Sequence, residues 1–147
     1  MSTRSNIGYV EDEKAKVVYC HSDGYLEWNG KLLFKHFNSL EKAKEIVALG
    51  DLSFLEEKLY PSDGIEHSFD KRESGVTVAY HRDRGEELEI NEYEVSKTNP
   101  LEDLKKLDAC MIEYVYIFYQ NQWWVKHTSV NHFVLLEDEL NKLKDWL

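Results

Sequence analysis

The chain has 147 residues, 42% of them hydrophobic and 13% aromatic, so it is long enough and apolar enough to bury the core of a single domain spanning residues 1–147. Its 28 acidic residues outnumber its 18 lysines and arginines, and the net charge of -10 argues against general binding of DNA or RNA, because a negative surface repels a polyanion. Two cysteines, Cys20 and Cys110, are typical of a reducing compartment, and the lack of an apolar leader or membrane-length run predicts a cytoplasmic protein without a membrane segment.

The first predicted element is a β-hairpin. Residues 5–10 and 16–21 alternate in the manner of two strands, with a charged turn between them. An antiparallel pair with this turn brings Arg4 close to His21 and Asp23 at the far end of the second strand. We therefore expect a guanidinium group at that corner, unless the terminus is frayed and solvated.

The stretch with the most chemistry is residues 19–25, Tyr-Cys-His-Ser-Asp-Gly-Tyr, which follows an apolar strand. Tyr19 and His21 should share one face of that strand, and Asp23 with Gly24 predicts a tight turn. A histidine at a strand end can bind a metal, transfer a proton or hydrogen-bond a ligand. The alternative is an ordinary capped turn in which the histidine bonds a backbone group.

Helices come next in the chain. Apolar spacing predicts helices over residues 31–37 and 40–49, with Asn38 or Ser39 capping the second, and one more helical turn over residues 51–55. These helices supply apolar faces for packing and carry no evident chemistry.

The middle of the chain holds a second polar strand end. Residues 62–74 form a predicted loop, which is either a binding loop or surface filler. Residues 75–81 alternate like a strand that ends at His81, with Arg82 and Arg84 directly after it. Two guanidinium groups present paired donors that match phosphate oxygens, so this end is a candidate anion site. The alternative is a charged turn in which the arginines pair with the intervening aspartate.

In the second half of the chain, residues 87–95 predict an exposed strand, and a helix should begin at Asn99-Pro100. Residues 111–119 are apolar on both faces and predict a central strand, with residues 123–127 as its antiparallel partner. Residues 135–147 predict an amphipathic helix. Strand pairs outnumber any alternation of strand and helix. The fold class expected is therefore α+β, with a mostly antiparallel sheet of four to six strands covered by helices on one face.

The aromatic residues bear on function as well as on packing. Most of them are expected in the core, because buried aromatic rings dominate domain energetics. Tyr25 and Trp28, beside the Asp-Gly turn, are the candidates for stacking on a ligand such as a nucleotide base.

Four segments carry a resemblance to a known group, namely residues 3–7 (Thr-Arg-Ser-Asn-Ile), 19–25, 30–33 (Gly-Lys-Leu-Leu) and 48–53 (Ala-Leu-Gly-Asp-Leu-Ser). Together they cover the first third of the chain and resemble a group of small phage and prophage proteins. Small acidic phage proteins of this size and aromatic content are in turn similar to anti-CBASS sponges, which oligomerise and sequester the cyclic nucleotides that activate bacterial defence.

This resemblance implies a homo-oligomer in the bacterial host cytoplasm that binds a small anionic nucleotide without turnover and without a cofactor or metal. For such a ligand, Arg4, His21, Arg82 and Arg84 would meet phosphates, and Tyr25 and Trp28 would stack on bases. Tyr19, Asp23 and His81, at the same two strand ends, complete the set of candidate ligand-binding residues.

Two other classes of function compete with this one. A small hydrolase could use a His/Asp pair at either strand end, although the chain has no H-E-x-x-H, C-x-x-C, P-loop or nucleophile-elbow motif. An inhibitor that binds a host protein could use the negative charge to mimic a nucleic acid. Salt dependence separates mimicry from sequestration, because a complex held by exposed charges weakens steeply with added salt.

Overall fold

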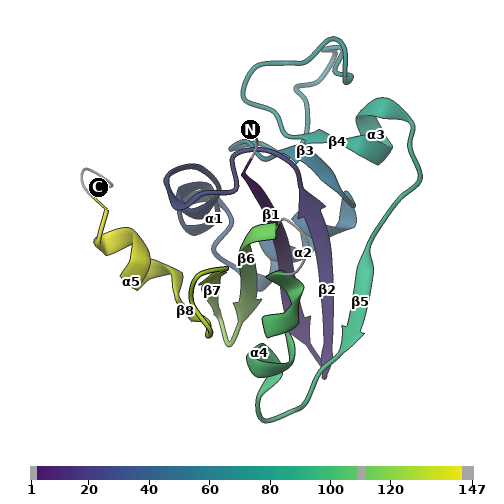
Figure 1. Cartoon of the computed structure of the whole chain (residues 1–147). Coiled ribbons are helices and arrows are strands. Elements are labelled where there is room, and N and C mark those ends of the chain that lie inside the picture. The colour runs from purple at the N-terminus through teal and green to yellow at the C-terminus, as the bar shows by residue number, and fades with distance from the viewer. Residues whose placement is uncertain (1–2, 109–111, 144–147) are drawn as a thin grey trace.

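The computed structural model describes residues 3–108 and 112–143 (Figure 1). The strands are β1 (Arg4–Glu11), β2 (Lys14–Cys20), β3 (Leu52–Phe54), β4 (Val78–Ala79), β5 (Asn91–Glu94), β6 (Ile112–Tyr119), β7 (Gln122–His127) and β8 (Val134–Leu135). The helices are η1 (Leu26–Gly30), α1 (Lys31–His36), α2 (Leu40–Ala48), α3 (Tyr80–Arg84), α4 (Pro100–Asp103), η2 (Lys105–Asp108) and α5 (Leu136–Asn141).

The strands form one eight-stranded sheet in the order β4-β3-β2-β1-β6-β7-β8, and β5 pairs with β2 beside this path. The pairs β1–β6 and β2–β3 are parallel, whereas the other pairs are antiparallel. The predicted α+β class and mostly antiparallel sheet are confirmed. The sheet has more than the expected four to six strands because β3, β4 and β8 are two or three residues long, too short for an alternating pattern to reveal.

Two tight hairpins organise the centre of the sheet, and both were expected. The turn between β1 and β2 places Asp12 and Glu13 at φ 53° and 63°, and the turn between β6 and β7 places Gln120 and Asn121 at φ 52° and 65°. Two consecutive positive φ values match the right-handed twist of antiparallel strands. The β1–β2 register, which ends at Ser5 opposite Cys20, brings the start of β1 to the end of β2.

Helices cover both faces of the sheet, not one face as predicted. One core cluster joins α1, α2 and α5 to the face that carries Ile7, Val18 and Tyr116. A second cluster joins the α4–η2 segment to the opposite face through Leu104 and Leu107. The central strand β6 contributes apolar residues to both clusters, as its sequence predicted.

Two predicted elements are wrong. The turn predicted over residues 51–55 is the strand β3, because Gly50 at φ +78° ends the preceding helical run and lets Leu52 pair with Cys20. The strand predicted over residues 75–81 is reduced to β4, after which the chain enters α3. His81, Arg82 and Arg84 therefore lie on a helical turn.

The terminal helix is shorter than predicted. It spans Leu136–Asn141, and the expected residues 144–147, like Cys110 and Met111, lie outside the described residues.

Tyr116 is a fully buried residue of the first core cluster, and the loss of its hydroxyl gives a stability prediction. Its fully buried hydroxyl donates a hydrogen bond of 2.6 Å to the carbonyl oxygen of Gly24. We expect Tyr116→Phe to lower the free energy of unfolding by about 1–3 kcal/mol, because the carbonyl is left buried without its partner. Urea denaturation measures the loss. Tyr60→Phe, at a side chain that is 53% exposed, is the matched control and should change little.

Candidate functional site

The N-terminus, β3, β4 and α3 lie together at one end of the sheet (Figure 1). Tyr19 and His21 lie there on one face, as predicted, with the Tyr19 hydroxyl 2.6 Å from Nδ1 of His21. The backbone N–H of His21 donates to the carbonyl oxygen of Leu52, and the N–H of Tyr19 donates to a carboxylate oxygen of Asp51 at 2.9 Å. The His21 ring is thus positioned by a tyrosine and does not rely on Asp23.

Arg4 and Tyr80 lie beside Tyr19. Burial raises the pKa of the Tyr19 hydroxyl; the positive charge of Arg4 opposes this rise, and Tyr80 and Asp51 add to it. Burial also raises the pKa of the Asp51 carboxyl. The corner predicted from the hairpin therefore forms, with Arg4 close to the tyrosine that bonds His21.

The residues that follow β2, from Asp23 to Trp28, differ in how they contact the rest of the fold. Asp23 adopts φ 57°, and the N–H of Gly24 donates to the carbonyl oxygen of Thr3 at 2.8 Å. The Tyr25 hydroxyl bonds Asp23 and its pKa is raised, first by burial. Nε1 of Trp28 donates to the carbonyl oxygen of Leu55 at 2.9 Å, which fixes the indole as a partly buried anchor.

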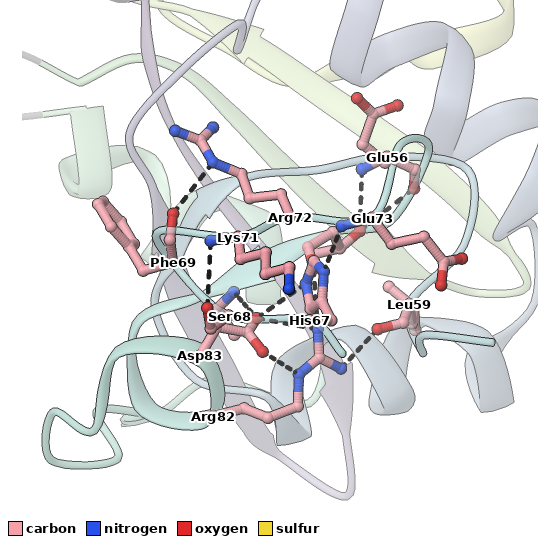
Figure 2. A network of polar contacts seen from close by, with 12 residues as sticks. Glu56, Leu59, His67, Ser68, Phe69, Lys71, Arg72, Glu73, Arg82 and Asp83 are labelled. Carbon is pink, nitrogen blue, oxygen red and sulfur yellow. Dashed lines mark hydrogen bonds and ion pairs between the residues drawn. The ribbon is translucent and has the colours of Figure 1, made fainter. Parts of the chain in front are cut away.

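A second polar network has the buried Asp83 at its centre (Figure 2). The Asp83 carboxylate, with a side chain 2% exposed, accepts hydrogen bonds from Nε and Nη2 of Arg82 at 2.9 and 3.0 Å. It also accepts from the backbone N–H of Ala79 at 2.8 Å and lies 3.4 Å from Nε2 of His67. A carboxylate with this many donors is compatible with its deep burial.

Arg82 and His67 extend the network to the backbone of the neighbouring segments. Arg82 donates to the carbonyl oxygens of Leu59 and Thr77. His67 accepts from the N–H of Glu73 through Nδ1 at 3.0 Å, so its proton sits on Nε2, which donates to the Thr77 carbonyl at 3.1 Å. The guanidinium of Arg82 is therefore occupied in holding the fold.

The network holds the long loop over residues 62–74 in a defined shape. The Glu73 carboxylate accepts from both the N–H and the hydroxyl of Ser62, at 3.0 and 2.8 Å, and these bonds lower the pKa of the Glu73 carboxyl. The N–H of Phe69 donates to the Asp83 carbonyl at 2.7 Å. Hydrogen bonds thus hold the loop at its base and near its middle, and they fix the position of Phe69.

Five residues form what we term the arginine–aromatic surface: Phe54, Phe69, Arg72, Tyr80 and Arg84. The guanidinium carbon of Arg72 lies 5.3 Å from the Phe54 ring centre and 5.6 Å from that of Phe69. The guanidinium of Arg84 lies 4.7 Å from the Phe69 ring centre, and Phe69 stacks on Tyr80 with ring centres 6.2 Å apart. Cations and aromatic rings are therefore interleaved across this surface.

The surface is accessible and partly hollowed. Phe69, Asp83 and Arg84 border a hollow of about 370 Å³ together with Ser68 and Asp70. The Arg84 side chain is 52% exposed and pairs with Glu86 at 3.2 Å. Arg72 is also exposed, and within residues 3–108 and 112–143 no ion pair is found for it.

The structure therefore brings some predicted site residues together and separates others. Tyr19 bonds His21, and the charges of Arg4 and Tyr80 act on the Tyr19 hydroxyl; Tyr80 in turn stacks on Phe69, which contacts Arg84. Three other predicted residues have partners of their own: Trp28 and Arg82 as described, and His81 through a bond of 2.6 Å between Nδ1 and the Glu86 carbonyl.

Sequence reasoning missed Phe54, Phe69 and Arg72. Phe69 and Arg72 lie in a loop without periodicity, and Phe54 lies on a three-residue strand. The one signal that was available is that the chain has four arginines, Arg4, Arg72, Arg82 and Arg84, three of them within thirteen positions.

Cys20 lies within the polar stretch but is not a reactive group. It is fully buried, and burial raises the pKa of its thiol to about 11. The thiolate is the reactive form, and at pH 8 only about one Cys20 in a thousand carries it. We expect Cys20 to resist iodoacetamide at pH 8 in the native protein and to be alkylated after unfolding, as measured by peptide mass spectrometry. Rapid native alkylation would contradict the buried position.

Residues 3–108 and 112–143 bear on two further kinds of function, metal binding and membrane insertion. They contain no cluster of three or more histidine, cysteine, aspartate or glutamate residues able to hold a metal ion. No helix among them has both the length and the apolar character needed to cross a membrane.

With this geometry established, the chain was compared with known proteins. No family model, no curated protein and no solved structure matches it significantly, so the functional argument rests on the contacts described above.

Proposed function

We propose that the protein binds a small anionic nucleotide, of the cyclic oligonucleotide class, at the arginine–aromatic surface and sequesters it without turnover. The observation that carries the proposal is the placement of the arginines. In a chain with a net charge of -10, Arg72 and Arg84 both contact the ring of Phe69, and Arg4 lies beside the tyrosine that adjoins Tyr80. Such local cation density is typical of phosphate recognition.

The surface offers both kinds of contact that a nucleotide needs. A base can stack on an aromatic ring or a guanidinium plane, which contributes about 1–3 kcal/mol per base. The guanidinium groups of Arg72 and Arg84 can donate paired hydrogen bonds to phosphate oxygens. The acidic remainder of the surface opposes such a ligand only weakly, because charges more than about 8–10 Å away are screened at physiological salt.

The corner formed by Tyr19 and His21 extends the same site. Tyr80, which stacks on Phe69, also acts electrostatically on Tyr19, and Arg4 contributes a positive charge there. The Tyr19–His21 pair supplies donors and acceptors for a base edge or for a second phosphate. A ligand with two phosphates and two bases, such as a cyclic dinucleotide, has groups for both parts of the surface.

Equilibrium titration with cyclic di- and trinucleotides at low and at high salt tests this proposal. A substantial part of the affinity should survive added salt, because stacking on the aromatic rings is not screened, whereas the phosphate contacts of the exposed arginines weaken. No heat of binding for any member of the panel at either salt concentration would overturn it. Light scattering on the same samples reports whether the protein forms the homo-oligomer that belongs to this proposal.

A second candidate function is supported by a different surface. Strand β5 is an exposed element whose Glu92 and Glu94 lie beside β2, and it follows a segment containing Glu86, Glu87 and Glu89. A band of carboxylates can imitate the phosphates of a nucleic acid toward a basic host protein. That complex should lose affinity steeply with salt, which is the opposite of the result expected for sequestration.

A further inference from the structure

A second pocket, separate from the arginine–aromatic surface, lies beside β7, β8 and α5. It has a volume of about 370 Å³, and Leu26, Val125 and Val134 contribute apolar walls. His127 and Ser129 also border it. An apolar pocket with a few convergent polar groups is the usual setting of a small-molecule site.

Three polar side chains next to this pocket form a continuous hydrogen-bonded series. The Ser129 hydroxyl oxygen lies 2.6 Å from Nδ1 of His127, and the backbone N–H of Ser129 donates to the same nitrogen at 3.1 Å. Nδ1 is therefore an acceptor and the ring proton is on Nε2, which lies 3.3 Å from a carboxylate oxygen of Glu113. The serine proton thus points at an unprotonated ring nitrogen whose opposite side faces a carboxylate.

The fold accounts for this arrangement. Tyr114 pairs with His127 across β6 and β7, so the residue before Tyr114 and the residues after His127 lie at the same end of the hairpin. The pairing of β1 with β6 shifts there, from Arg4 opposite Ile112 to Ser5 opposite Tyr114, which leaves Glu113 as an extra residue. Such a bulge redirects a side chain, and bulges are common beside functional sites.

The aromatic ring of Tyr114 and the opening of the pocket complete the site. The Tyr114 ring meets the His127 ring edge-on, with centres 4.7 Å apart, and restricts how the imidazole can turn. The side chains of His127 and Glu113 are 34% and 46% exposed, so a substrate can reach the series from solvent. Lys142 and Glu139 also line the pocket and form an ion pair of 2.8 Å at its border.

We propose that this pocket is an acyl-transfer site in which Ser129 is the nucleophile, His127 the general base and Glu113 a positioning residue, acting on small esters with an apolar acyl group. The Ser129 oxygen bonds to the ester carbonyl carbon while its proton passes to Nδ1 of His127. The ester C–O bond then breaks and His127 protonates the departing alcohol. A water molecule then gives a proton to Nδ1 of His127 as its oxygen bonds to the acyl carbon. The bond between that carbon and the Ser129 oxygen breaks, the acid departs, and His127 returns the proton to Ser129.

A fluorophosphonate probe tests the nucleophile directly, because it forms a stable bond only with an activated hydroxyl. We expect peptide mass spectrometry to find the label on Ser129. Ser129→Ala should lose both labelling and hydrolysis of p-nitrophenyl butyrate, and His127→Gln should slow labelling by about 100-fold or more. Thr128→Ala removes a neighbouring exposed hydroxyl and should label like the unmodified protein.

The test of Glu113 must distinguish its positioning of His127 from a contribution to folding alone. Glu113→Gln should slow labelling and Glu113→Asp should restore part of the rate, with the same unfolding midpoint in both variants. Absence of label on Ser129, or hydrolysis that is unchanged in Ser129→Ala, would overturn the proposal. Neither result bears on nucleotide binding, because these variants leave the arginine–aromatic surface intact.

Discussion

Asp83→Ala is expected to lower the free energy of unfolding by about 3–5 kcal/mol, the largest stability effect of any single substitution considered for this protein. The carboxylate accepts hydrogen bonds from Arg82 and from the N–H of Ala79, and it lies 3.4 Å from His67. Its removal leaves a partly buried guanidinium charge without its counterion and a buried N–H without an acceptor. Breaking one side of a buried ion pair is far more costly than losing a surface pair.

Urea denaturation followed by tryptophan fluorescence measures this effect. Asp70→Ala is the matched control, because it removes an exposed carboxylate from the loop next to the network and should change the free energy by about 0.5 kcal/mol or less. Asp83→Asn keeps one acceptor oxygen and should fall between the two. Equal losses for Asp83→Ala and Asp70→Ala would show that the network does not hold the loop.

The double variant Arg72→Ala/Arg84→Ala is expected to weaken nucleotide binding by about 100-fold or more. A hydrogen bond to a charged group contributes about 1.5–3 kcal/mol, so each guanidinium accounts for about one to two orders of magnitude in affinity. Both side chains are exposed, and the unfolding midpoint should therefore stay close to that of the unmodified protein. Titration calorimetry with the nucleotide that binds best measures the affinity.

A charge-matched control separates this site from general electrostatics. Lys42→Ala/Lys97→Ala removes two exposed cations from other parts of the chain and should leave the affinity nearly unchanged. Arg82→Ala gives a useful contrast, because its contacts to Asp83, Leu59 and Thr77 predict lost stability as its main effect. Equal loss of affinity in the two double variants would place the binding elsewhere or make it unspecific.

Periodicity predicted those parts of the fold in which a long segment has one clear apolar face. The hairpin of β1 and β2 and the pair of β6 and β7 are of this kind, and so is α2, whose cap at Ser39 accepts from the N–H of Lys42. Periodicity did not predict the shorter elements. β3 forms because β2 offers an edge to pair with, and β4 forms because β3 offers the next edge; no local pattern in two or three residues indicates such a partner.

The contacts of the candidate site also fall into those that the sequence predicted and those that it did not. The Tyr19–His21 contact follows from strand alternation and was predicted. The pairing of Arg82 with Asp83 is the alternative that the sequence offered. The bond from Arg82 to Leu59 was not predicted, because Leu59 is 23 positions away and only the folded loop reveals the contact. Phe69 and Arg72 were missed for the same reason. The phage resemblance, and the sequestration it implies, stay predictions.

The central claim, that this protein holds a nucleotide without altering it, is tested most directly by recovering the ligand. The purified protein is mixed with cyclic di- and trinucleotides, freed of unbound ligand and heat-denatured, and the released material is identified by chromatography. We predict that one intact cyclic nucleotide is recovered in an amount stoichiometric with binding sites. A cleaved nucleotide would indicate turnover, and an empty protein across the whole panel would contradict the account.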